Sequence, residues 1–236
     1  MSKFKVIVAA VILAIGMIGL GLCIRSGINS ISQQSRTVSV RGLAEREVSA
    51  NKVTWPIVYK IVGNDLSSLY NEIQRNNKSI IKYLTDNGVK ESEISVNAPE
   101  IYDRLADRYT SVGRYDDRYN VTSVLVVVSS DVDRIRQLIA NQGELLKEGI
   151  VVTDGGYQYQ VQFEFTDLNL IKPEMIAQAT ANAREAGERF AKDSESTLGK
   201  IKTADQGQFS ITDRDPNTPF IKRIRVVTRI DFYLED

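Results

Sequence analysis

The residues best suited to chemistry or recognition lie between positions 102 and 119. This segment holds four tyrosines, four arginines and four aspartates within 18 residues. Tyr and Arg are enriched in binding surfaces because they combine a large contact area with directional polar groups. A long solvated hairpin with alternating charges explains the same composition equally well. On the first interpretation, the interaction surface consists of Tyr102, Arg104, Arg108, Tyr109, Arg114, Tyr115, Arg118 and Tyr119.

The four aspartates of this segment, Asp103, Asp107, Asp116 and Asp117, are also the type of residue that a glycoside hydrolase uses. Such an enzyme needs two carboxyl groups at a defined separation. The sequence neither fixes a separation nor indicates a raised pKa for any of them. We therefore predict no catalytic residue here.

A second acidic segment, at residues 213–217, places oxygen-bearing side chains at alternate positions, as the start of a calcium loop does. An EF-hand loop continues with glycine at its sixth position and glutamate at its twelfth. This chain has Thr218 and Ile224 there instead. We predict a structural turn and no metal or cofactor, although the sequence leaves open whether a metal binds near Asp213.

The cysteine and histidine content excludes several kinds of active site. The only cysteine is Cys23, in an apolar N-terminal segment, and the chain has no histidine. The remaining residues therefore cannot form a Ser-His-Asp triad, a cysteine nucleophile, a His/Cys zinc site or a disulfide framework. We predict that the protein is not an enzyme.

The N-terminal segment predicts a membrane anchor. From Val6 to Ile24 there are 19 consecutive residues without a charge, and as a helix they would extend for about 28 Å, which matches a bilayer core. Lys3 and Lys5 precede the span and favour a cytoplasmic N-terminus. We predict a single-pass protein of the inner (cytoplasmic) membrane, with its C-terminal part on the periplasmic or extracellular side.

Two other interpretations of this segment remain open. A cleaved signal peptide would have a shorter apolar stretch and a small-residue cleavage site. A lipid on Cys23 would call for a small residue before it, where this chain has Leu22. We predict an uncleaved stub and anchor over residues 1–24, a polar tether over 25–36 and a folded domain over 37–236.

The charge balance argues against binding to nucleic acid. The chain has zero formal charge, but its first 36 residues carry four basic and no acidic side chains. Residues 37–236 therefore hold 26 Lys and Arg against 30 Asp and Glu. Binding to nucleic acid depends on a basic surface that releases counterions, which this balance does not predict.

The hydrophobic patterns predict an α+β fold with a mixed or antiparallel sheet, three helices and the order ββαββαβαββ. The clearest strand pattern is at residues 157–165, where aromatic or aliphatic residues alternate with glutamine and glutamate. The other predicted strands are 38–40, 53–61, 93–101, 120–128, 201–211 and 222–235. The predicted helices begin at the cap Asp65, at the cap Asp131 and near Pro173.

Three segments resemble the SIMPL-domain family of bacterial periplasmic or envelope proteins. They are Thr-Val-Ser-Val-Arg-Gly-Leu-Ala-Glu at 37–45, Trp-Pro-Ile at 55–57, and an alanine-rich helix at 177–191 that leads into Leu-Gly-Lys-Ile at 198–201. Many members carry a second glycine where this chain has Ala44, so the chain resembles a Gly-Leu-Ala-Glu subgroup. The resemblance implies an envelope location, assembly into oligomers, links to envelope or oxidative stress, and no catalytic residue.

The expected function is that of a non-enzymatic, membrane-anchored envelope protein that forms a homo-oligomer. The alternative is a periplasmic module that binds a glycan, peptide or small anion through the segment 102–119. A hydrolase is the weakest hypothesis because no pair of residues is marked by its spacing.

Overall fold

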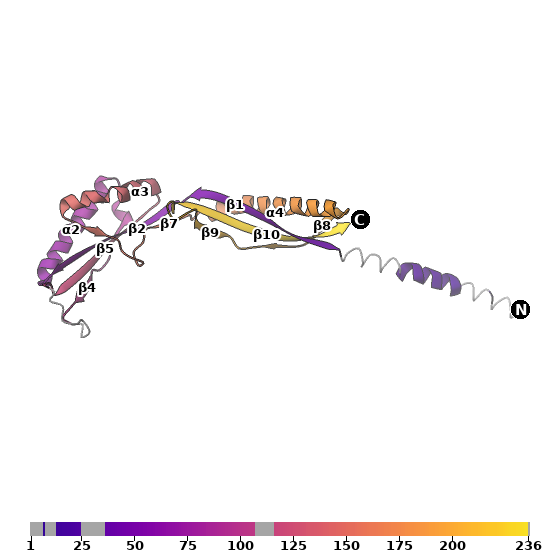
Figure 1. Ribbon diagram of the computed structural model, residues 1–236, viewed down its shortest axis with the longest axis horizontal. Coiled ribbons are helices and arrows are strands. Elements are labelled where there is room, and N and C mark those ends of the chain that lie inside the picture. The colour runs from indigo at the N-terminus through magenta and orange to yellow at the C-terminus, as the bar shows by residue number, and fades with distance from the viewer. Residues whose placement is uncertain (1–6, 8–12, 25–35, 107–115, 236) are drawn as a thin grey trace. The chain divides into compact units, whose positions relative to one another are not determined.

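The computed structural model describes residues 7, 13–24, 36–106 and 116–235 (Figure 1). The fold is α+β, as predicted. The chain divides into two compact units. The first unit comprises Met1–Arg46, Asn169–Ile211 and Ile224–Asp236, and the second comprises Glu47–Leu168 and Thr212–Arg223.

The elements follow one another in the order ββαβββαββαβββ, with two short 3₁₀ helices, η1 (Glu91–Glu93) and η2 (Gln142–Glu148). The α-helices are α2 (Leu66–Asp86), α3 (Val132–Ala140) and α4 (Leu168–Asp193). The strands are β1 (Thr37–Ser49), β2 (Lys52–Gly63), β3 (Ile94–Val96), β4 (Glu100–Asp103), β5 (Tyr119–Ser129), β6 (Val152–Thr153), β7 (Gln162–Glu164), β8 (Thr197–Gln206), β9 (Ser210–Asp213) and β10 (Ile221–Glu235).

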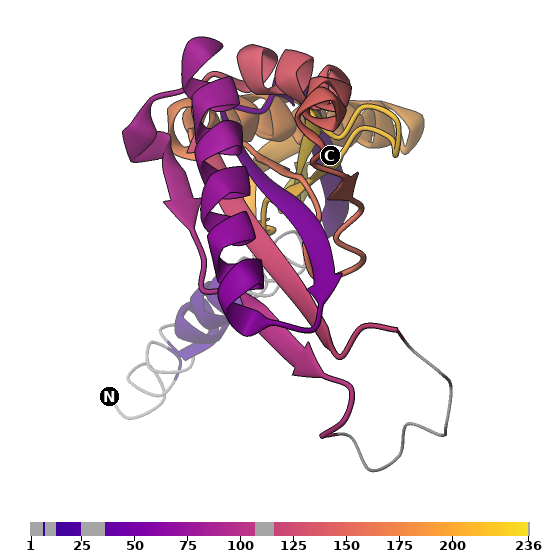
Figure 2. The same ribbon diagram turned by 90° about the vertical axis from the view of Figure 1, so that its left-hand side faces the viewer.

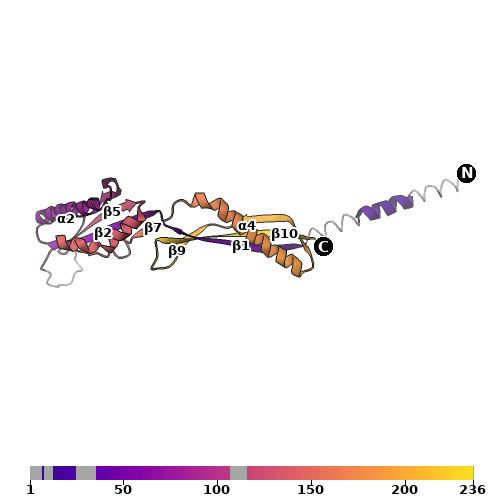
Figure 3. The same ribbon diagram turned by 90° about the horizontal axis from the view of Figure 1, so that it is seen from above.

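The first unit is built on a sheet with the strand order β1-β10-β8, and β9 also pairs with β10. Helix α4 runs along one face of this sheet and crosses β1 and β10 obliquely (Figures 1 and 3). The side chains between the helix and the sheet form a small apolar core of Val40, Ala183, Ile230 and Phe232. The opposite face of the sheet carries the alternate, more exposed residues of β1 and β10.

Close approach of α4 to the sheet depends on small residues. A Cβ atom at Gly42 of β1 would lie only 1.8 Å from the carbonyl oxygen of Ala179 and 2.5 Å from the backbone nitrogen of Ala183. Only glycine leaves room for this helix backbone. The alanine-rich pattern of 177–191 therefore has a packing role, which brings the helix directly onto β1.

The second unit contains a six-stranded sheet with the order β3-β5-β2-β6, in which β4 also pairs with β5 and β7 with β2. All these pairings are antiparallel. Helix α2 lies against β2 and β5 (Figure 2). The core of the second unit is larger than that of the first unit and includes Trp55, Ile57, Tyr59, Ile73, Ile80, Leu84, Val121, Leu125, Val127, Ile135 and Leu138.

Helix α2 begins and ends as the sequence predicts. The Asp65 side chain caps it by accepting hydrogen bonds from the backbone N–H (2.8 Å) and the hydroxyl (2.6 Å) of Ser68. Gly88, just past its end, has φ +86°, a conformation that glycine adopts without strain.

The prediction of a strand at residues 157–165 is wrong for most of that segment. Only Gln162–Glu164 form a strand, and the Tyr157 side chain, on the aromatic side of the predicted alternation, is fully exposed. The physical reason lies on the neighbouring strand. Pro56 of β2 has no N–H to donate, and residues 154–161 leave the sheet where they pass it.

Several predicted boundaries also need correction, and with them the predicted order of elements. The strands predicted at 93–101 and 201–211 are each two shorter strands, and α4 begins at Leu168, before Pro173. The second predicted helix ends at Ala140 and is followed by η2, so the described residues from position 36 onward contain two 3₁₀ helices besides the three predicted α-helices.

The predicted membrane anchor lies partly outside the described residues, which omit residues 6 and 8–12 of the span and residues 25–35 of the tether. Residues 13–24 are helical and exposed. In the part of the chain that the structure describes, no helix is both long and apolar enough to cross a membrane.

Candidate functional site

Four of the eight residues of the predicted interaction surface are described: Tyr102, Arg104, Arg118 and Tyr119. They lie where β4 ends and β5 begins, and Tyr102 is opposite Asn120. The other four, Arg108, Tyr109, Arg114 and Tyr115, lie outside the described residues. The structure thus brings the described half of the predicted surface together at one end of the second unit.

The described part of the hairpin formed by β4 and β5 is held by an ion pair with two hydrogen bonds. Arg118 Nε donates to Asp103 Oδ1 (3.0 Å), and Arg118 Nη2 donates to Asp103 Oδ2 (2.7 Å). The guanidinium carbon also lies 4.8 Å from the centre of the Tyr119 ring. Such a planar, two-bond pair fixes geometry as well as charge, so Arg118 joins the two strands.

One of the aspartates considered for hydrolysis, Asp103, does not have the electrostatics of a general acid. The hydrogen bond from Arg118 holds the pKa of Asp103 below its usual value, whereas a general acid needs a raised pKa. The backbone carbonyls of Asp116 and Asp117 accept hydrogen bonds from Asn64 (3.0 Å) and Arg104 (3.2 Å). Asp107 lies outside the described residues.

The segment from Asp213 forms a turn whose carboxylates are already hydrogen-bonded. Asp213 accepts from Lys222, and Asp215 Oδ1 accepts from the backbone N–H groups of Asn217 (2.9 Å) and Thr218 (3.0 Å). Hydrogen bonds from the Thr218 hydroxyl, first, and from Arg214 lower the pKa of Asp215. Across residues 7, 13–24, 36–106 and 116–235, no group of three or more His, Cys, Asp or Glu is placed to hold a metal ion.

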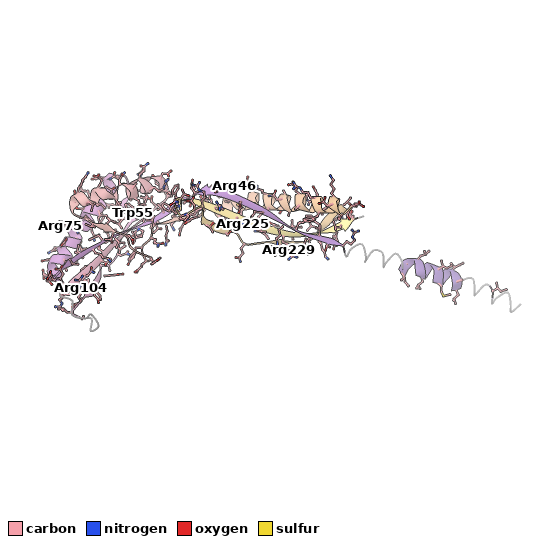
Figure 4. All side chains as sticks on the ribbon, in the orientation of Figure 1. Arg46, Trp55, Arg75, Arg104, Arg225 and Arg229 are labelled. Atoms are coloured by element: carbon pink, nitrogen blue, oxygen red, sulfur yellow. The ribbon has the colours of Figure 1, made fainter. Side chains whose placement is uncertain are left out.

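The first unit has a polar arrangement on the sheet face that α4 does not cover. We call it the charged face. Arg225 and Arg229 of β10 point away from α4, whereas Arg46 lies on the helix side and pairs with Glu174 (2.8 Å) (Figure 4). The charged face consists of Ser39, Arg41, Leu43 and Glu45 of β1, Arg225, Val227, Arg229 and Asp231 of β10, and Thr203 and Asp205 of β8.

Cross-strand contacts connect the side chains of the charged face. Arg229 Nε donates to Ser39 Oγ (3.1 Å), and the Thr203 hydroxyl donates to Asp231 Oδ2 (2.6 Å). The ion pairs are longer: Arg225 Nε to Glu45 Oε1 is 3.6 Å and Arg229 Nε to Asp231 Oδ1 is 3.7 Å. Hydrogen bonds from Thr203, first, and Ser39 lower the pKa of Asp231. Asp231 is therefore ionised at neutral pH, and the two ion pairs of the face are longer than a hydrogen bond.

The sequence also matches a known family, SIMPL, described as a protein of unknown function (DUF541), over residues 38–224. The chain belongs to the SIMPL family. No curated protein matches the chain. The SIMPL match includes the β1 and β8 residues of the charged face and ends one residue before Arg225. Arg225 and Arg229 of β10 therefore lie beyond the match.

The charged face was not among the predicted sites of this SIMPL chain, although part of its signal is in the sequence. Arg225, Val227 and Arg229 alternate with buried residues, as do Arg41, Leu43 and Glu45. Each alternation shows that one strand face is polar. Neither shows that β1 lies beside β10, because these strands are separated by most of the chain.

Proposed function

We propose that the protein is a non-enzymatic, membrane-anchored envelope protein that self-associates through the charged face. The observation that carries the proposal is the charge pattern of this face. It presents the arginines Arg41, Arg225 and Arg229 among the carboxylates Glu45, Asp205 and Asp231, and Lys202 lies beside Asp231. A two-fold contact between identical subunits requires a self-complementary patch, and interspersed charges of both signs satisfy that requirement.

The geometry of the ion pairs supports exchange between subunits. Arg225 and Glu45 are 3.6 Å apart, with side chains about half exposed (53% and 45%). Exposed pairs of this kind stabilise a fold by at most about 1 kcal/mol. Re-pairing them with a second copy therefore sacrifices little, and Leu43 and Val227 add apolar area between the charges.

The sheet face is a better contact than the sheet edge. Strand β1 is at the edge of its sheet, and a long edge is a template for strand pairing. However, Asn182 of α4 donates to the backbone carbonyl of Leu43 (2.7 Å), so part of that edge is already occupied. We therefore place the contact on the charged face.

The remaining parts of the proposal rest on the sequence. The uncharged segment from Val6 to Ile24 supports the anchor. The lack of histidine and the single cysteine support the absence of catalysis. Gly42, which α4 requires, and the buried Ala44 support membership of a Gly-Leu-Ala-Glu subgroup.

The experiment compares the full chain with an R225E/R229E double variant, both extracted from carbonate-washed membranes. We expect the parent to form an oligomer by sedimentation velocity. The dissociation constant of the oligomer should be at least about tenfold higher for the double variant than for the parent, because like charges would face each other across the contact. Raising the salt to about 0.5 M should weaken the parent assembly as well.

The matched control is Arg75→Glu on the exposed surface of α2, in the second unit, which should sediment like the parent. A parent that remains monomeric at every concentration overturns self-association. An oligomer that R225E/R229E leaves intact overturns the charged face as the contact. Recovery of the chain from the soluble fraction argues against the anchor.

A further inference from the structure

The second unit contains a pocket at a break in its sheet. Strand β7 pairs with Lys52, Val53 and Thr54 of β2, and β6 pairs with Val58 and Tyr59. These pairings leave residues 55–57 of β2 unpaired on this side. Residues 154–161 loop outward across the break and form one side of an open pocket of about 550 Å³, a volume within the usual range for small-molecule sites.

Pro56 explains why the break persists. The Thr153 hydroxyl donates to the backbone carbonyl of Val58 (3.3 Å), so Val58 faces β6. Backbone groups of alternate strand residues point to the same side, so Pro56 faces the break as well. Since proline has no N–H, neither the chain's own strand nor an added peptide strand can complete the ladder there.

The loop over the break is held in shape by its own residues. Gly155 forms a bridge with Tyr159, and a Cβ atom at Gly155 would lie 2.2 Å from the Cβ of Tyr159. Gly156 has φ +61° and donates its N–H to the Asp154 carboxylate. The Tyr159 hydroxyl donates to Glu100 Oε1 (3.0 Å). The pocket wall is therefore built, although Tyr157 at its rim is fully exposed.

The lining favours a neutral ligand rich in hydroxyl groups. Gln142, Gln160 and Thr153 offer both donors and acceptors. Asp154 is the only charged side chain among the lining residues, which include no Lys or Arg, so an anionic ligand would find no counter-charge. Tyr157 offers an exposed aromatic ring, which pairs an apolar face with a polar tip.

We propose that this pocket binds a neutral oligosaccharide, with one sugar ring against Tyr157 and its hydroxyl groups hydrogen-bonded to the amides of Gln142 and Gln160. Sugar rings present apolar C–H faces and polar edges, which match this lining. A peptide strand matches less well because Pro56 cannot donate to it. The site lies wholly in the second unit and does not depend on self-association.

Trp55 provides a direct measurement of binding. It is the only tryptophan in the chain and lies in the pocket wall. The full chain, held in a zwitterionic detergent without a sugar headgroup, is titrated with chitotetraose, cellotetraose and maltotetraose while tryptophan fluorescence is recorded. We expect a saturable change with at least one tetrasaccharide and none with a polygalacturonate oligomer.

Variants locate the binding. Tyr157→Ala should raise the Kd roughly tenfold, which is equivalent to the loss of one aromatic contact and its hydrogen bonds. Tyr70→Ala removes a tyrosine that is 59% exposed on α2, outside the pocket, and should leave the Kd unchanged. The R225E/R229E variant should also bind normally, which separates this site from the assembly contact.

Three results would overturn the proposal. They are no fluorescence change with any of the three tetrasaccharides at millimolar concentration, an unchanged Kd in Tyr157→Ala, and preferential binding of a proline-rich decapeptide over the saccharides. The last would reassign the pocket to peptides.

Discussion

Gly42 is the residue at which the backbone of one element touches the backbone of another. The Cβ of an alanine here would lie 1.8 Å from the carbonyl oxygen of Ala179, so α4 would have to move away from β1. Overpacking of this kind destabilises a fold by about 1–3 kcal/mol. We expect Gly42→Ala to lower the free energy of unfolding by that amount, measured by urea unfolding followed by circular dichroism.

The control for Gly42→Ala is Gly143→Ala. No atom lies within 4 Å of a Cβ at Gly143, so this substitution should be neutral or slightly stabilising. Equal effects at the two positions would show that α4 yields to the added methyl group, and the close approach would then not be a constraint.

The sequence identifies individual residues better than it identifies the residues that they contact. It places Gly42 and Ala44 in the motif that opens the domain, but the reason for Gly42 lies on a helix more than 130 residues later. Likewise, the sequence predicts that Arg118 and Asp103 belong to one segment. Only the register of β4 and β5 shows that they form an ion pair.

Helix α2 depends on its N-terminal cap. Removing the Asp65 carboxylate leaves the backbone N–H of Ser68 without its acceptor, and loss of such a cap costs about 1 kcal/mol. We expect Asp65→Ala to lower the urea midpoint of the second unit, followed by the fluorescence of Trp55. Asp65→Asn keeps an oxygen in the capping position and should retain most of the stability. If both variants behave alike, the cap contributes nothing beyond its charge.

Local signals predict elements well where the element completes its own hydrogen bonds. The extent of α2 follows from its cap, its apolar stripe and Gly88. A strand is different, because its existence depends on a neighbour. The alternation at residues 157–165 is a clear strand pattern, yet Pro56 on β2 denies it a partner, and Tyr157 is fully exposed. The same break creates the pocket. The sequence did not predict this pocket, because the break depends on a residue of the neighbouring strand.

Across the whole molecule, the described carboxyl groups with a clearly shifted pKa are all shifted downward. In each case the largest cause is a hydrogen bond from a neighbouring side chain, and the groups are Asp65, Glu93, Asp103, Glu174, Asp215 and Asp231. The chain has no histidine, the side chain that ordinarily titrates near neutral pH. The acid response of the protein should therefore come from carboxylates alone.

This balance predicts a stability profile that is flat near neutral pH. A carboxyl group whose folded pKa is below its unfolded value of about 4 stabilises the fold above that pH and loses its contribution as the pH falls through the folded pKa. Burial raises the pKa of Tyr59, so its contribution is present below about pH 10 and is lost above it. We expect the free energy of unfolding, from urea titrations at pH 3 to 11, to change little between about pH 6 and 8, to fall steeply below about pH 4 and to fall again above about pH 10. A decline of more than about 1 kcal/mol between pH 8 and 6 would contradict this account, because no side chain with an ordinary pKa in that interval is present to cause it.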